Sequence, residues 1–241
     1  MGERLNIGEM EKTTEDEHIA RYAYACRFTK EKSVIDAACG TGYGSLMLAR
    51  NGAREVIGVD ISELAIAKAQ DKYHHPNVRF LTLNVEELSK LGDQIADVVV
   101  SFETIEHVND DQIFLGEVHR VLKTGGVFIV STPEIRCGGV KERLTRIPAN
   151  PFHRREYTRN AFAALISERF VVDEILGQNQ ISKFLTFMPV TVCAKLGLRL
   201  LAMAGITRFR NVYLHGTGDE LVPEQQCKWG MPRFWIIRCH K

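Results

Sequence analysis

The chain of 241 residues lacks several features that would assign it to a binding or secreted class. Its formal net charge is only +1, so no basic excess indicates a nucleic-acid or polyanion partner. It has no C-x-x-C pair, and its six cysteines are scattered. This favours a reduced, cytoplasmic protein over a disulfide scaffold or a zinc module. Residues 1–17 contain no apolar core of the kind that a secretory signal needs, so we expect no such signal.

Long apolar runs are missing as well. The most apolar stretch, residues 184–206, is interrupted by Pro189, Lys195 and Arg199. Its uncharged pieces fall short of the ~20 residues that span a bilayer, so we expect no transmembrane segment. Its near-helical apolar spacing favours a helix that packs on the core or covers the site. Membrane-surface contact and a homodimer interface are two other interpretations that the sequence leaves open.

What the sequence does have is a regular alternation of apolar strands and amphipathic helices. No repeat or low-complexity linker divides it, which predicts a single domain over residues 1–241. Apolar strands separated by helices are typical of a parallel sheet covered on both faces. We therefore predict an α/β fold with a doubly wound, mostly parallel, seven-stranded sheet. Its expected strands are 33–38, 55–60, 78–83, 96–102, 127–132, 170–176 and 233–239. Residues 134–157 and 177–232 interrupt the alternation and are expected to form a small substrate cap.

Helix starts and strand ends indicate where a ligand should lie. Ser62, Asn109 and Thr158 each precede a helical pattern, and each has a side chain that can cap a helix. Ligands of doubly wound sheets bind at the carboxyl ends of the strands. The residues at or just beyond these ends are Asp36, Asp60, Asn84, Phe102, Glu103 and Thr132.

A glycine-rich turn follows the first strand, in VIDAACGTGYGS (residues 34–45). Ser45 stands where the dinucleotide fingerprint G-x-G-x-x-G has its third glycine, and no Gly-Lys-Ser/Thr follows as in a phosphate-binding loop. A pyrophosphate here would meet the carboxylate of Asp36, at a cost of about a few kcal/mol. The ammonium and sulfonium groups of S-adenosylmethionine (SAM) would be attracted instead. Asp60 ends the second strand, where an acid can accept hydrogen bonds from both ribose hydroxyls.

Five segments carry a resemblance to a known family. VIDAACGTGYGS, VIGVDIS, FLTLNVEEL, ADVVVSFETIEHV and LKTGGVFIVSTP resemble, in order and spacing, the class I SAM-dependent methyltransferases over residues 15–176. The resemblance implies a Rossmann-like fold, SAM as cofactor and a methyl-transfer enzyme. It also implies a methionine-side loop of Asp36, Ala38, Gly40 and Gly42, a ribose contact at Asp60, an adenine contact at Ile61, and an adenine edge at Asn84 and Val85.

The sequence departs from the pattern of this family at two positions, and three further residues are predicted to contact the cofactor. Many relatives have Asp in place of Asn84 and Gly in place of Ala38. Phe102 and Glu103, at the end of the fourth predicted strand, and Tyr22, on the first helix, are further predicted cofactor contacts. If that helix folds over the cofactor, its Arg21 can pair with the SAM carboxylate; core packing of Tyr22 and a solvated Arg21 are the alternatives.

The acceptor is indicated only by short segments. EHIARY (17–22) and NPFHRREYT (150–158) resemble methyltransferases that are encoded beside glycosyltransferases in polysaccharide and antibiotic pathways. This favours a small-molecule acceptor with a hydroxyl, on a sugar or a glycosylated metabolite, as in natural-product biosynthesis. The alternatives are an N-methyltransferase acting on an amino sugar or other amine, a quinone-type O-methyltransferase, and a non-catalytic SAM-binding protein.

Histidines are the candidate bases for a hydroxyl acceptor, because histidine is the commonest base near neutral pH. His153 and His107 follow the fifth and fourth predicted strands and are the two candidate catalytic residues, whereas His18 is expected to have a surface or capping role. Glu103 and Glu106 can orient the acceptor or a histidine, or stay solvated. The segment SFETIEHV lacks the Asp/Asn set of metal-dependent catechol-type methyltransferases, so no metal is expected.

Overall fold

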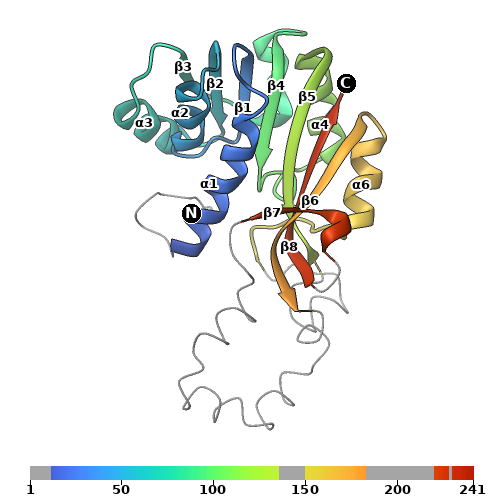
Figure 1. Cartoon of the computed structure of the whole chain (residues 1–241). Helices are drawn as coiled ribbons and strands as arrows, with labels where there is room; N and C mark the ends of the chain where they lie inside the picture. Colours follow the sequence, from blue (N-terminus) through green and yellow to red (C-terminus); the bar gives the residue numbers. More distant parts are fainter. Residues whose placement is uncertain (1–11, 136–149, 183–219, 228–229) are drawn as a thin grey trace, which may run out of the picture.

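The computed structural model of the chain describes residues 12–135, 150–182, 220–227 and 230–241. Within them, eight strands form one mixed sheet in the order β3-β2-β1-β4-β5-β8-β6-β7, flanked by helices (Figure 1). The strands are β1 (Ser33–Ala37), β2 (Glu55–Asp60), β3 (Val78–Thr82), β4 (Ala96–Phe102), β5 (Leu122–Pro133), β6 (Val171–Ser182), β7 (Leu221–Pro223) and β8 (Gly230–His240). The helices are α1 (Lys12–Cys26), α2 (Tyr43–Arg50), α3 (Glu63–Lys72), α4 (Asp111–Val121) and α6 (Arg159–Ser167), with 3-10 helices η1 (Val85–Leu91) and η3 (Glu224–Gln226).

Each face of the sheet has its own apolar core. In β4, Val99 is buried in one cluster together with Phe114 of α4. Its neighbour Val98 is buried in a different cluster together with Leu48 of α2. Successive side chains of a strand point to opposite faces, so the two clusters lie on the two sides of the sheet. Burial on both faces is why the strands appear in the sequence as continuous apolar runs.

The direction of strand addition reverses between β1 and β4. β1 pairs in parallel with β2 on one side and with β4 on the other. The loops that leave β1 and β4 therefore diverge, and they open the crevice where doubly wound sheets bind ligands. Both loops contain a non-glycine residue in left-handed backbone conformation, Ala38 (φ 65°) and Glu103 (φ 53°). Such residues are uncommon in that region, so surrounding contacts hold both loops in place.

The sheet confirms the predicted α/β, doubly wound class and differs from it in strand number. β8 is antiparallel to β5 and β6, as a mixed sheet requires. The additional strand is β7, which pairs with β6 inside the segment expected to form a cap. Three residues are too few to produce a periodic signal in the sequence. β6 also continues beyond the predicted end at residue 176, paired with β8 as far as Ser182.

Most of the two expected cap segments lies outside the described residues. This applies to 136–149 and to 183–219, which include the apolar stretch 184–206, so their predicted roles remain predictions. At the described ends of the first segment, the Ile135 N–H donates to the Tyr157 carbonyl at 3.1 Å, which brings the two ends of the segment together. In the part of the chain that the structure describes, no helix is both long and apolar enough to cross a membrane.

Helix caps agree with the sequence at two of three positions. The side chains of Ser62 and Thr158 each accept a hydrogen bond from a backbone N–H in the first turn of α3 and α6. The prediction for Asn109 is wrong, because Asp110 caps α4 by accepting from two backbone N–H groups. Asn109 instead donates to the carboxylate of Glu86, so a tertiary contact takes the place of the local one.

Candidate active site

A cavity of about 770 Å³ lies where β1, β2 and β4 end, and its size is typical of small-molecule sites. Of the thirteen predicted site residues, only Asp36 and Gly42 do not line it. The eleven that do are Tyr22, Ala38, Gly40, Asp60, Ile61, Asn84, Val85, Phe102, Glu103, His107 and His153. We call the part formed by Gly40, Asp60, Ile61 and Asn84 the cofactor side, and the part formed by Glu106, His107 and His153 the acceptor side.

The glycines of the turn after β1 have different roles. Gly40 has a left-handed backbone (φ 54°), and a Cβ built on it would meet no atom within 4 Å, so the turn presents bare backbone. Its N–H donates to Asp60 Oδ2 at 3.0 Å. A Cβ on Gly42 would lie 2.7 Å from Ala69 and Phe80. Gly40 therefore leaves space beside the cavity, whereas Gly42 allows the turn to pack against α3 and β3.

Asp36 lies behind the cavity wall and does not face a ligand. Its side chain is buried, and its oxygens accept hydrogen bonds from Tyr22 Oη at 3.0 Å and from Ser45 Oγ at 2.6 Å. Burial raises the pKa of Asp36 to about 6. The electrostatic attraction inferred from the sequence thus acts from behind Tyr22, whose ring stacks edge-on against Phe102 and Tyr43.

The remaining cofactor side combines one acid, one apolar surface and one amide. Asp60 is buried, and besides Gly40 it holds the backbone N–H of Ser62 at 2.8 Å. Both carboxylate oxygens keep a second lone pair for a ligand hydroxyl. The next side chain, Ile61, is 66% exposed beside the cavity and offers a surface for a planar ring. Asn84 Oδ1 accepts from the backbone N–H of Glu86 and so caps η1.

Helix α1 contributes buried polar groups that apolar periodicity could not indicate. Arg21 is fully buried, and none of its guanidinium nitrogens has a hydrogen-bond partner among the described residues. Its Nη1 lies 3.5 Å from Glu103 Oε1, and its guanidinium lies over the ring of Phe234 at 4.7 Å. His18, expected at the surface, is buried and lines the cavity, and burial lowers its pKa well below the usual value. A buried guanidinium without hydrogen bonds is costly, and the ion pair with Glu103 offsets part of that cost; Arg21 itself is not among the residues that line the cavity.

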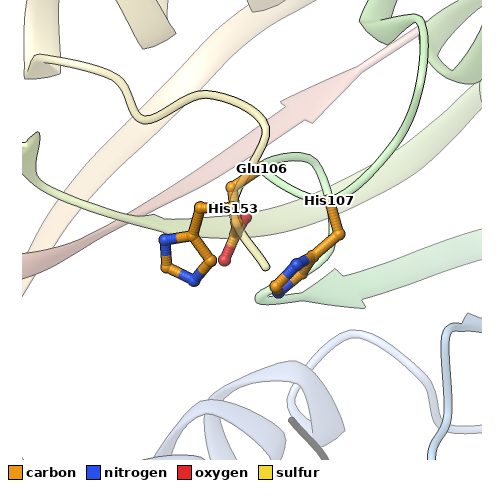
Figure 2. A group of neighbouring side chains, drawn as sticks. All are labelled: Glu106, His107 and His153. Carbon is orange, nitrogen blue, oxygen red and sulfur yellow. The ribbon is translucent and has the colours of Figure 1, made fainter. Parts of the chain in front are cut away.

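On the acceptor side, two histidines from distant segments stack edge to face, with ring centroids 4.8 Å apart (Figure 2). His107 Nδ1 lies 3.0 Å from the carbonyl oxygen of Phe152, which can only accept, so the proton is on Nδ1 and the Nε2 lone pair is free of it. His153 Nδ1 lies 2.6 Å from Glu156 Oε1, which assigns the same tautomer. His153 Nε2 lies 3.0 Å from the amide nitrogen of Asn150, a donor.

A carboxylate lies beside the two rings. Glu106 is fully buried, and its Oε2 accepts from Thr132 Oγ1 at 3.1 Å, whereas Oε1 has no hydrogen-bond partner among the described residues. Burial and the neighbouring charge of Glu103 raise the pKa of Glu106 well above its usual value. One carboxylate oxygen of Glu106 and one ring nitrogen each of His107 and His153 lie within 4.8 Å of one another. The sequence predicted that Glu106 lies near the site, but it gave no indication that Glu106 lies close to His153.

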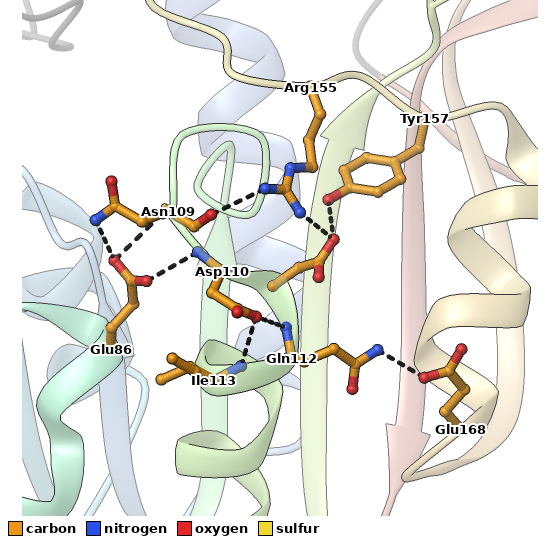
Figure 3. Close-up of polar contacts among 9 residues, drawn as sticks. Glu86, Asn109, Asp110, Gln112, Ile113, Arg155, Tyr157 and Glu168 are labelled. Atoms are coloured by element: carbon orange, nitrogen blue, oxygen red, sulfur yellow. Dashed lines mark hydrogen bonds and ion pairs between the residues drawn. The ribbon is translucent and has the colours of Figure 1, made fainter.

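Polar contacts fix the loops that carry these side chains (Figure 3). Glu86, just after β3, accepts from the backbone and the amide of Asn109, in the loop after β4. Arg155 donates to the carbonyl of Asn109 at 2.9 Å and to Asp111 Oδ2 at 2.7 Å, and Tyr157 Oη donates to the same oxygen at 2.9 Å. The segment 150–157, which includes His153, is thereby attached to the start of α4.

Comparisons with known proteins find similarity to methyltransferases. Residues 35–130 match the family described as "Methyltransferase domain". Over 158 residues the chain is 40% identical to a "Probable S-adenosylmethionine-dependent methyltransferase" of Mycolicibacterium smegmatis, an alignment that covers 65% of this chain and 58% of that protein. Over 118 residues it is 32% identical to a ubiquinone biosynthesis O-methyltransferase of Rhizobium etli, covering 48% and 47%. The matched part of the chain thus spans about half of the length of these relatives.

The fold has solved counterparts. The crystal structure of a SAM-dependent methyltransferase from Mesorhizobium loti superimposes with a TM-score of 0.59 at 16% identity, covering 93% of this chain and 100% of that one. At this identity the likeness concerns the fold alone. It agrees with the α/β fold described above.

Proposed function

We propose that this chain, which is similar to the SAM-dependent methyltransferases, methylates a hydroxyl of a small molecule. SAM is the cofactor of this class, and it supplies a methyl group that its sulfonium activates for in-line displacement by the acceptor oxygen. We infer a sugar or glycosylated metabolite as the acceptor class. The single observation that carries the proposal is the cavity itself, which has a nucleotide-type side and, opposite it, a histidine pair with ordered tautomers.

The chain's own residues fit the cofactor on the cofactor side. The open space at Gly40 lets a ligand approach the backbone of the turn. Asp60, already held by two backbone N–H groups, is oriented to accept from ribose hydroxyls. Ile61 offers the exposed apolar surface for adenine. The guanidinium of Arg21 has no hydrogen-bond partner among the described residues. Its positive charge would attract the carboxylate of the methionine part of SAM.

The acceptor side fits a hydroxyl better than an apolar group. Of the two histidines, His107 is the better placed base, because its Nε2 has no hydrogen-bond partner among the described residues, whereas His153 Nε2 receives the amide of Asn150. Phe152 holds the proton of His107 on Nδ1, so Nε2 is ready to take the proton of the acceptor. The neighbouring carboxyl and amide groups of Glu106, Asn150 and Glu156 offer a polyhydroxylated molecule further hydrogen bonds.

One alternative acceptor has support of its own. A phenolic hydroxyl is favoured by the likeness to a ubiquinone biosynthesis O-methyltransferase, which covers less than half of either chain. Both acceptors require the same proton transfer, so they share the role proposed for His107. An amine acceptor that is already deprotonated would not need it.

The test begins with cofactor choice and continues to the product. The purified protein is titrated calorimetrically with SAM and, separately, with NAD⁺; we expect heat of binding from SAM alone. The protein is then incubated with SAM carrying a deuterated methyl group and with panels of sugars, glycosides, phenols and amines. Mass spectrometry should find the label on the oxygen of a hydroxylated molecule, together with S-adenosylhomocysteine. Binding of NAD⁺ without SAM, or label on nitrogen only, would overturn the proposal.

A further inference from the structure

We propose that Glu106, His107 and His153 form a binding site for one divalent transition-metal cation, with Zn²⁺ as the best match. The proposal departs from the expectation of no metal, which rested on the segment SFETIEHV alone. The fold brings His153, which lies in residues 150–158 after β5, next to that segment, and Figure 2 shows the three side chains grouped beside one another. Two imidazoles and one carboxylate are a ligand set typical of catalytic metal centres that keep open positions.

The ligand atoms are nearly close enough for such an ion. One atom from each residue lies within 4.8 Å of the others. Around a zinc ion, neighbouring ligand atoms at ~2.1 Å from the metal are about 3.3 Å apart. A contraction of up to about 1.5 Å is within the reach of side-chain rotation at His153, which lies in a loop and not in a helix or strand.

The outer contacts of both histidines are those of metal ligands. A metal-binding imidazole almost always donates its other N–H to a carboxylate or a backbone carbonyl, which fixes the ring and leaves one lone pair for the ion. His107 donates from Nδ1 to the carbonyl of Phe152, and His153 donates from Nδ1 to the carboxylate of Glu156. In both rings Nε2 is therefore the nitrogen with the lone pair. Two histidines oriented in the same way beside one carboxylate indicate a shared ligand.

Glu106 provides the independent observation. Its carboxyl group is fully buried, and Oε1 has no hydrogen-bond partner among the described residues, although buried oxygens usually have one. The carboxyl groups of Glu103 and Glu156 are also close, the first by its charge interaction with Glu106 and the second by its contact with His153. A cation at this point would offset the cost of burying the Glu106 carboxylate and its repulsion by the neighbouring acids. No hydrogen bond to Oε1 from the described residues offsets either cost.

Binding has one identifiable obstacle and one consequence. Asn150 Nδ2 donates to the lone pair of His153 Nε2, so the amide has to move aside when the ion binds.

The imidazole ligands favour Zn²⁺ over Mg²⁺, which prefers oxygen ligands. Open positions of the ion would face the cavity, where the acceptor hydroxyl proposed above can bind and be polarised; this consequence rests on the proposed function, whereas ion binding does not. An ion and a proton on His107 Nε2 exclude each other, so the two ways of activating the hydroxyl can be told apart.

The experiment uses the full chain after chelator treatment and dialysis, without SAM or acceptor. Calorimetric titration with Zn²⁺, and the visible spectrum on adding Co²⁺, should both saturate at one equivalent, and Zn²⁺ should displace Co²⁺. Glu106→Gln, His107→Gln and His153→Gln should each weaken binding by about 100-fold or more, and Glu156→Gln by about 10-fold, as expected for a group that only orients a ligand. Mg²⁺ should not compete at equal concentration.

His18→Gln is the matched control, because His18 lines the same cavity outside the cluster; it should bind Zn²⁺ as the unchanged chain does. Circular dichroism verifies that each variant is folded, and Glu156→Gln, which leaves all three proposed ligands in place, stands in if a ligand variant fails to fold. Absence of saturable binding, or equal affinity in every variant, would overturn the proposal. Binding of SAM without the ion would reject this site alone, and binding of the ion without SAM would reject the proposed function alone.

Discussion

The two sides of the cavity are built in different ways. On the cofactor side, backbone turns and one acid do most of the positioning: Gly40 donates to Asp60, and Asp60 holds the start of the next loop. These contacts join residues at or just beyond the ends of the neighbouring parallel strands β1 and β2. On the acceptor side, side chains bind groups that are distant in the sequence, as in the contacts of His107 with the backbone carbonyl of Phe152 and of Arg155 with the carboxylate of Asp111. The geometry of the cofactor side therefore follows from the arrangement of the strands. The geometry of the acceptor side depends on particular residues in loops that are distant in the sequence.

If the two sides of the cavity bind their ligands independently, a substitution on one side should not change the affinity on the other. The largest loss of affinity is expected from a substitution of Asp60. Asp60→Asn removes the charge and one acceptor that the ribose hydroxyls need, so SAM affinity should fall about 100-fold, or nearly 3 kcal/mol. Binding of Zn²⁺ on the acceptor side should not change. Calorimetric titration with each ligand measures both.

The control for this variant is Glu63→Gln, which removes the same charge from an exposed residue in the first turn of α3. It should lower SAM affinity less than twofold, since exposed charges are screened. An equal loss in both variants would mean that net charge, and not the contact at Asp60, determines cofactor affinity.

This contrast explains how much the sequence could predict. The positions of the predicted strands, the turn at Gly40 and the acid at Asp60 follow from local patterns, because each is encoded in a short stretch of sequence. Asn109 was misassigned because its bond to Glu86 competes with capping, and a local pattern cannot include a partner from another loop. The burial of Arg21 and His18 on α1 was not predicted either, since polar residues give no apolar period. The grouping of Glu106 with His153 depends on a loop return that only the structure shows.

A second effect, on stability rather than on the affinity for SAM, is expected behind the cofactor side, at Asp36. Its pKa is about 6 in the folded chain against 3.8 ordinarily, because burial disfavours the carboxylate. The stability that the neutral acid provides is complete below pH 3.8 and is lost as the pH rises through about 6. Asp36→Asn cannot ionise and therefore avoids this loss. The free energy of unfolding of the variant, minus that of the unchanged chain, should increase with pH by roughly 3 kcal/mol in total.

Urea unfolding of both chains between pH 4 and 8 measures this difference. A difference that does not vary with pH would mean that the carboxyl group keeps the same protonation state folded and unfolded. The variant also sharpens the comparison of the two sides. Because Asp36 lies behind Tyr22, its loss should weaken SAM binding less than Asp60→Asn does. A larger loss would place the attraction for the cofactor's positive charge at Asp36 after all.

The smallest effect is expected where the acceptor side is attached to the fold. Arg155→Met keeps the apolar stem but removes the bonds to Asp111 and to the carbonyl of Asn109. Because the guanidinium is partly exposed, the loss of stability should be only about 1 kcal/mol. Backbone amides of 150–157 should nonetheless exchange with deuterium faster, since this segment loses its attachment to α4. Zn²⁺ affinity should fall through His153, while SAM affinity stays unchanged.

Arg169→Met provides the matched control, because Arg169 also reaches α4, through a hydrogen bond to Gln112, but lies away from the cavity. It should leave exchange in 150–157 and both affinities as they were. Equal exchange in the two variants would mean that other contacts hold the segment, of which the backbone bond between Arg154 and Glu106 is the strongest candidate. Loss of SAM affinity in Arg155→Met alone would mean that the two sides are coupled through the loop after β4, since Glu86 ties Asn109 to the end of β3 beside Asn84.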